Sequence, residues 1–123
     1  WLNENGIIMV TGDGTGTETR IGKHKVFNFF GQPVMFPLGP AILGQKTGAE
    51  ILTVVILPGE KKLFKIIIGK SITTEDSGDD GIQDITQQFI NRLGNYINRY
   101  PGYMHFLDRF CPGELIEGKN IVL

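Results

Sequence analysis

The glycine-rich stretch GDGTG, residues 12–16, has the composition of a phosphate-binding loop. Its spacing fits neither nucleotide motif, because no Gly-Lys-Ser or Gly-Lys-Thr closes it and Thr17 stands where a dinucleotide motif needs a further glycine. Residues 11–25 are too polar to form a core, so they predict a surface loop. A flexible substrate loop and a plain surface turn are both open interpretations.

The two histidines are the only side chains that titrate near neutral pH. His24 lies between two lysines, which predicts a solvated ring, whereas His105 lies among apolar residues, which predicts burial with a hydrogen bond to the backbone. Two histidines and the single cysteine Cys111, without closely spaced ligands, argue against a zinc site, and no cofactor is expected. An unpaired Cys111 fits a reducing compartment.

The stretch FPLGPAILGQKTG, residues 36–48, predicts a short helix over residues 40–47. Gly39 can serve as N-cap, Pro40 suits the first helical position, and Gly48 can adopt the left-handed conformation that ends a helix. Free N–H groups and the positive end of the helix dipole favour an anion at Gly39 and Pro40. Since every helix has such an end, a purely structural helix start is the open alternative.

Size and composition favour one globular unit over residues 1–123. A chain of 123 residues with 41% apolar residues can form one core and is short for two. Its net charge of -1 gives no reason to expect nucleic acid as a partner. No run approaches the roughly 18 apolar residues that span a bilayer. Trp1 stands where Met is expected, so the sequence predicts a piece of a longer chain.

The remaining pattern predicts strands and one further helix. Residues 6–10 form a short apolar run typical of a buried strand, and residues 51–57 and 63–68, separated by PGEKK, predict a hairpin. Residues 81–99 predict a helix capped by Asp79 or Asp80. Its apolar residues recur at helical spacing: Ile82, Ile85, Phe89, Leu93, Tyr96 and Ile97. Alternating strands and helices predict the α/β class.

Four segments together resemble a known family in order and spacing. GIIMVTGDGTG (6–16), VFNFFGQPVMFPLGPAILGQKTGAEILTVVI (26–56), FKIIIG (64–69) and YINRYPGYMHFLDRF (96–110) are similar to the C-terminal half of the bacterial lipid A biosynthesis (lauroyl/myristoyl) acyltransferases, within the lysophospholipid acyltransferase superfamily. The resemblance implies an α/β fold with a mixed sheet and flanking helices, located at the cytoplasmic face of the bacterial inner membrane. It implies transfer of an acyl chain from acyl carrier protein or acyl-coenzyme A to a hydroxyl of a lipid A precursor or lysophospholipid.

Catalysis in that family depends on a histidine, four intervening residues and an aspartate. The histidine takes the proton of the acceptor hydroxyl and the aspartate orients the imidazole. Phe29 is the fifth residue after His24 and Phe110 the fifth after His105, so the pattern is absent here. No catalytic residue is assigned, and the chain alone is expected to be inactive.

The role that the resemblance leaves to this segment is substrate binding. Four features of the family have matching positions in this sequence. They are the acidic residue after the first strand, a Phe-Phe-Gly element, the glycine before the helix and a closing Arg-Phe pair. With the helix start and the basic loop residues added, the expected substrate-binding residues are Asp13, Arg20, Lys23, Phe30, Gly31, Gly39, Pro40 and Arg109. The alternative is a non-catalytic lipid- or protein-binding module derived from the same fold.

Overall fold

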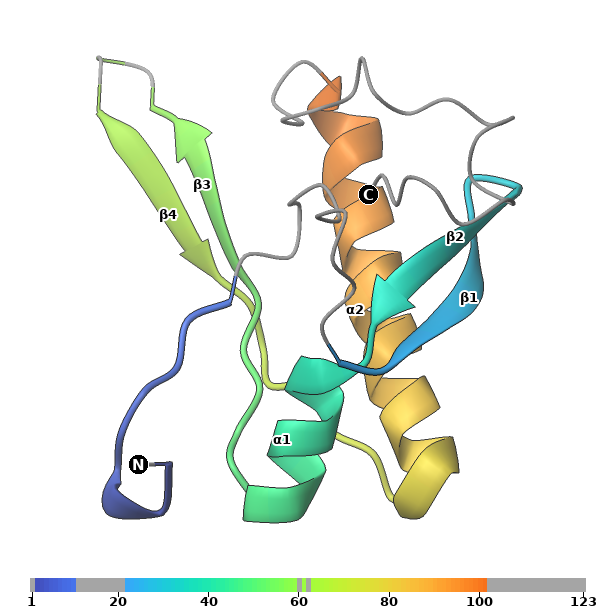
Figure 1. The fold of residues 1–123 in the computed structure, drawn as a ribbon. Coiled ribbons are helices and arrows are strands. Elements are labelled where there is room, and N and C mark those ends of the chain that lie inside the picture. Colours follow the sequence, from blue (N-terminus) through green and yellow to red (C-terminus); the bar gives the residue numbers. More distant parts are fainter. Residues whose placement is uncertain (1, 11–21, 60, 62, 102–123) are drawn as a thin grey trace.

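The computed structural model describes residues 2–10, 22–59, 61 and 63–101 (Figure 1). The elements in chain order are η1 (Leu2–Glu4), β1 (His24–Phe29), β2 (Gln32–Pro37), α1 (Gly39–Thr47), β3 (Val54–Pro58), β4 (Phe64–Ile68) and α2 (Gly78–Arg99). Helices thus alternate with strand pairs, which confirms the α/β expectation at the coarse level. The strands form two separate antiparallel sheets, β1–β2 and β3–β4, so the expected mixed sheet is wrong for the described residues.

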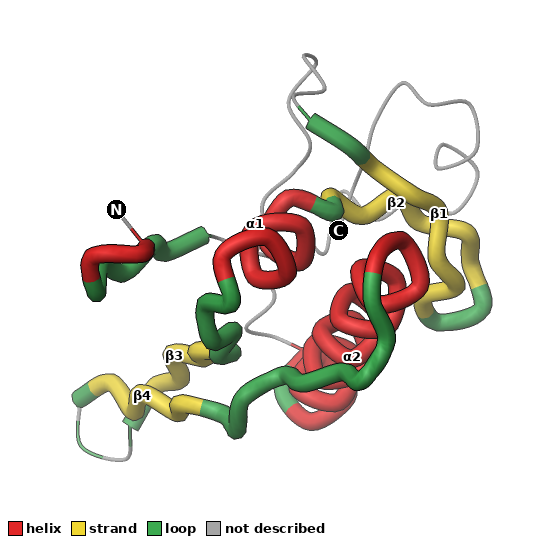
Figure 2. Tube along the Cα trace, turned by 90° about the horizontal axis from the view of Figure 1, so that it is seen from below, coloured by secondary structure: helices red, strands yellow, loops and turns green. Residues whose placement is uncertain are grey.

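The long helix α2 lies between the two hairpins. In Figures 1 and 2, β1–β2 lies on one side of α2 and β3–β4 on another, with α1 beside the N-terminal half of α2. Helix α2 packs mainly against α1 and β1. No helix in the part of the chain that the structure describes is both long and apolar enough to cross a membrane.

The first core joins the β1–β2 hairpin to α2. The ring of Phe36 meets the rings of Phe27 and Phe29 edge-on, with centroids 6.2 and 5.5 Å apart. Strand residues two apart point to the same face, so one face of the hairpin is buried while the other is exposed. The buried members of this core are Phe27, Phe29, Val34, Phe36, Ile90 and Ile97.

A two-residue turn connects β1 to β2. Phe30 and Gly31 both have positive φ, 50° and 77°, as a type I′ turn requires to match the twist of the strands. The Oδ1 atom of Asn28 accepts the Gly31 N–H at 3.0 Å. Glycine adopts this conformation freely, whereas a left-handed phenylalanine costs about 1–2 kcal/mol.

Helix α1 agrees closely with the sequence prediction. It begins at Gly39, with Leu38 rather than Gly39 in the N-cap position, one residue earlier than expected. Gly48 ends the helix with φ of 69°, and its N–H donates to the Gly44 carbonyl oxygen at 2.9 Å. Ala41 is buried in a second core with Ile72 and Ile85.

Helix α2 begins earlier than predicted. Its N-cap is Ser77 and its first residue is Gly78, so the expected cap at Asp79 or Asp80 is wrong. Both aspartates lie in the first turn instead, where their charge is favourable near the positive end of the helix dipole. The apolar spacing is confirmed, because Ile85 and Ile97 are buried, although the pattern omitted the buried Ile90.

The predicted hairpin of residues 51–57 and 63–68 is confirmed as β3–β4. The pairing of the two segments continues beyond the strands. Ile51 and Ile72 form an antiparallel bridge, and the Gly69 N–H donates to the backbone carbonyl oxygen of Thr53 at 2.8 Å.

The predicted buried strand at residues 6–10 is wrong. These residues are in no strand, and Ile7 and Met9 are 87% and 85% exposed. A short apolar run becomes a strand only with a pairing partner. Among the described strands β1 pairs with β2 and β3 pairs with β4, and neither pair includes this segment.

Candidate functional site

The expected substrate-binding residues that the structure describes lie in two separate places. The carbonyl oxygen of Lys23 accepts the Leu38 N–H at 2.9 Å, which brings Lys23 beside Gly39 and Pro40 at the start of α1. Phe30 and Gly31 lie in the turn at the other end of β1–β2, about 17 Å away at the rise of a six-residue strand. The two groups therefore do not form one site.

Several predictions fall outside the described residues. They concern Asp13, Arg20 and Arg109 among the expected substrate-binding residues, and also the GDGTG loop, His105 and Cys111. Of the two histidines only His24 is described. Its ring is half-buried, and Nδ1 lies 3.1 Å from the Gly22 carbonyl oxygen, so it is less solvated than its lysine neighbours suggested.

The start of α1 is open to a ligand. A Cβ built on Gly39 meets no atom within 4 Å, and no side chain caps the first turn. The free N–H groups there can donate to an anion. Most helices begin in the same way, so this geometry alone does not identify a ligand.

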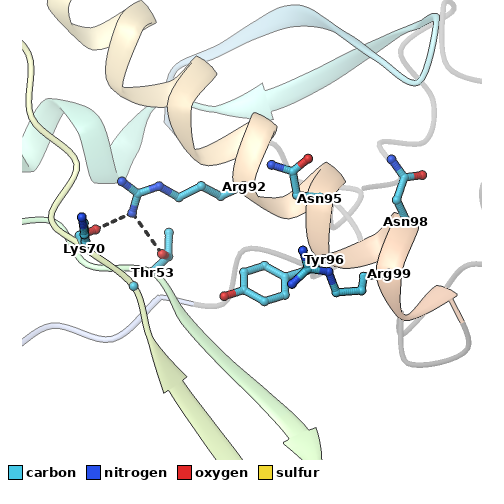
Figure 3. Close-up of a pocket in the computed structure, with 8 residues that line it drawn as sticks. Thr53, Lys70, Arg92, Asn95, Tyr96, Asn98 and Arg99 are labelled. Carbon is cyan, nitrogen blue, oxygen red and sulfur yellow. Dashed lines mark hydrogen bonds between the residues drawn. The ribbon is translucent and has the colours of Figure 1, made fainter.

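A cleft that the sequence interpretation did not predict lies between the C-terminal half of α2 and the base of the β3–β4 hairpin (Figure 3). We call it the basic cleft. Its volume is about 740 Å³. The residues that line it are Thr53, Gly69 and Lys70 from the hairpin side, and Arg92, Asn95, Tyr96, Asn98 and Arg99 from α2.

Arg92 joins the two walls of the basic cleft. Its Nη1 donates to the Thr53 hydroxyl at 3.2 Å and to the Lys70 carbonyl oxygen, and its Nη2 donates to the Ser71 carbonyl oxygen at 3.2 Å. The planar guanidinium suits this role, because its donors point in fixed directions. Arg92 therefore holds the base of the hairpin against α2.

The described residues that line the basic cleft carry positive charge and no negative charge. Lys70, Arg92 and Arg99 line it, and none of its described lining residues is acidic. The aspartates of α2 lie in its N-terminal part, at Asp79, Asp80 and Asp84, so the helix is acidic at one end and basic at the other. An anion is the ligand that such a cleft favours.

The spacing of four residues in the sequence could have predicted one wall of this cleft. Arg92, Asn95, Tyr96 and Arg99 follow the spacing i, i+3, i+4 and i+7, which places them on one face of a helix. The apolar spacing of α2 instead predicts that Tyr96 is a core residue. It is half-buried and lines the cleft.

The β3–β4 hairpin exposes an entirely apolar face, which we call the outer apolar face. Opposed residues of an antiparallel pair point to the same side, and the pairs here are Val54 with Ile68, Ile56 with Ile66, and Pro58 with Phe64. All six side chains are exposed, from 49% for Val54 to 78% for Phe64 where a fraction is given. Contiguous exposed apolar surface of this kind marks an interaction site.

Comparisons with protein families, curated proteins and solved structures give no match for this chain. The family resemblance described above therefore stays a prediction.

Proposed function

We propose that this chain is the substrate-binding, C-terminal part of a membrane-associated acyltransferase. The reaction moves an acyl chain from acyl carrier protein or acyl-coenzyme A to a hydroxyl of a lipid A precursor or lysophospholipid, at the cytoplasmic face of the bacterial inner membrane. The observation that carries the proposal is the outer apolar face, because an acyl chain needs contiguous apolar surface and soluble proteins rarely expose it. The resemblance in sequence supports the same assignment.

The chain contributes binding rather than the proton transfer of such a reaction. The attacking hydroxyl needs a base, and neither histidine has an aspartate at the required spacing. The free N–H groups of the first turn of α1, which begins at Gly39 and to which Pro40 adds no N–H, suit the negative oxygen that develops on the thioester carbonyl. The base would then belong to another part of the parent protein.

The test is binding of a fluorescent lysophosphatidylcholine to the whole chain. Its head group has no net charge, so the acyl chain dominates the contact. Ile56→Ser and Ile66→Ser, at side chains 61% and 62% exposed, should each weaken binding about fivefold, since covering an exposed isoleucine contributes roughly 1 kcal/mol. Val26→Ser is the matched control, because Val26 is 52% exposed on the other hairpin.

Equal losses in the three variants, or no saturable binding by the unmodified chain, would contradict the proposal. The variants should keep the circular dichroism spectrum of the parent, since all three side chains are exposed.

A non-catalytic lipid- or protein-binding module is the second candidate. The observation that favours it is the absence of the histidine and aspartate spacing at both His24 and His105. Acyl transfer measured with an acyl thioester and a lysophospholipid separates the two candidates. A parent protein that binds lysolipid but transfers no acyl chain would support the module.

A further inference from the structure

We infer that the basic cleft binds a phosphate monoester. The inference deepens the proposed function, on which it rests for the expectation that the phosphate belongs to a lipid substrate. The chemistry of the cleft itself comes from its own residues.

The free donors of the cleft are separate from its structural ones. Arg92 already donates to three protein oxygens, so it shapes the cleft and is a positioning residue. In the part of the chain that the structure describes, no hydrogen bond or ion pair engages the side chains of Lys70, Asn98 or Arg99. The Lys70 ammonium offers three N–H donors and the Arg99 guanidinium offers five, and both groups are suited to phosphate oxygens.

Charge favours phosphate over a carboxylate. A phosphate monoester carries about -1.5 to -2 at neutral pH, whereas a carboxylate carries only one negative charge. Lys70 and Arg99 come from different walls of the cleft, and Arg92 adds a third positive charge. These three charges are balanced better by a dianion than by a monoanion. Arg92 and Arg99 are seven residues apart on α2, or about 10 Å along the helix axis, which leaves room for a head group between them.

The first experiment titrates the whole chain with glycerol 1-phosphate, followed by calorimetry. Lys70→Gln and Arg99→Gln should each weaken binding about fivefold, and the double variant more than tenfold, because each removes one exposed charge next to the ligand. Lys46→Gln is the matched control, since Lys46 is an exposed lysine at the end of α1, outside the cleft. Its affinity should equal that of the unmodified chain.

The second experiment identifies the source of the phosphate. The chain is sedimented with phosphatidylcholine vesicles that contain or lack phosphatidic acid. Enhanced binding to phosphatidic acid that glycerol 1-phosphate displaces supports a lipid head group in the cleft. Binding of glycerol 1-phosphate without any such enhancement supports a soluble phosphate ester at the same residues.

Two results would overturn the inference: no saturable binding of glycerol 1-phosphate or phosphatidic acid vesicles, or the same weakening in Lys46→Gln as in the cleft variants. These failures are distinct from failure of the proposed function, which is measured with lysophosphatidylcholine and the outer apolar face. A chain that binds glycerol 1-phosphate but no lysophosphatidylcholine would keep the cleft and remove the acyl-binding role.

Discussion

Replacing Arg92 with methionine should loosen the β3–β4 hairpin from α2. Methionine keeps an unbranched apolar stem while removing all three hydrogen bonds to Thr53, Lys70 and Ser71. Hydrogen bonds to a charged donor contribute about 1.5–3 kcal/mol each when water cannot replace them. The cleft is open and Arg92 is half-buried, so water can reach the two carbonyl oxygens, whereas Thr53 is only 9% exposed. We therefore expect a total loss of about 2–3 kcal/mol in the free energy of unfolding.

Urea unfolding followed by circular dichroism measures this loss. For a chain of 123 residues it corresponds to a melting temperature lower by roughly 10 °C. The free energy of unfolding of Arg92→Lys should lie between those of Arg92→Met and the unmodified chain, since a lysine keeps the charge but cannot reach three acceptors in fixed directions. A double-mutant cycle with Thr53→Val should show a coupling of about 1 kcal/mol.

The reasoning fails if Arg92→Met unfolds within about 0.5 kcal/mol of the unmodified chain, the range of ordinary surface substitutions. It also fails if Arg92→Met and Thr53→Val are additive, because the hydrogen bond between them would then contribute nothing.

Three further substitutions use the same unfolding measurement. Gly81→Ala should lower the free energy of unfolding by about 1–3 kcal/mol, because its Cβ would collide with the backbone oxygen of Asp76. Gly94→Ala in the same helix should raise it by about 1 kcal/mol, because its Cβ meets only two phenylalanine rings at 3.7 and 3.8 Å. Equal effects of the two substitutions would contradict this. Phe30→Asn should change stability by less than about 1 kcal/mol, since relief of the left-handed strain offsets the lost contact of a ring that is already 47% exposed. Gly39→Ala should not lower the free energy of unfolding, because its Cβ would meet no atom within 4 Å, so any accompanying loss of lysolipid binding would indicate a ligand at the start of α1.

The helices could be predicted from the sequence where their cause lies in residues close together along the chain. Gly48 takes the left-handed conformation that stops α1, and the apolar spacing in α2 places Ile85 and Ile97 in the cores. Both features depend on residues a few positions apart, so the sequence contains the whole cause. The α2 start was misplaced because an aspartate in the first turn and an aspartate at the cap give the same pattern.

The basic cleft depends on contacts that no local pattern contains. Arg92 meets Thr53 and Lys70, which are 39 and 22 residues away along the chain. The spacing of Arg92, Tyr96 and Arg99 shows that they share a helix face, but not what that face meets. The same limit explains residues 6–10, whose apolar character predicted a strand although strand pairing decides whether one forms.

The outer apolar face belongs to the β3–β4 hairpin and the basic cleft lies at the base of the same hairpin, so one ligand could in principle contact both surfaces. Among the described strands β4 pairs only with β3. Lysophosphatidic acid carries both an acyl chain and a phosphate monoester. If one molecule occupies both surfaces, Ile66→Ser and Arg99→Gln should be non-additive in their effect on its affinity, with a coupling above about 0.5 kcal/mol. Additive effects would show that the acyl chain and the phosphate are bound independently of each other.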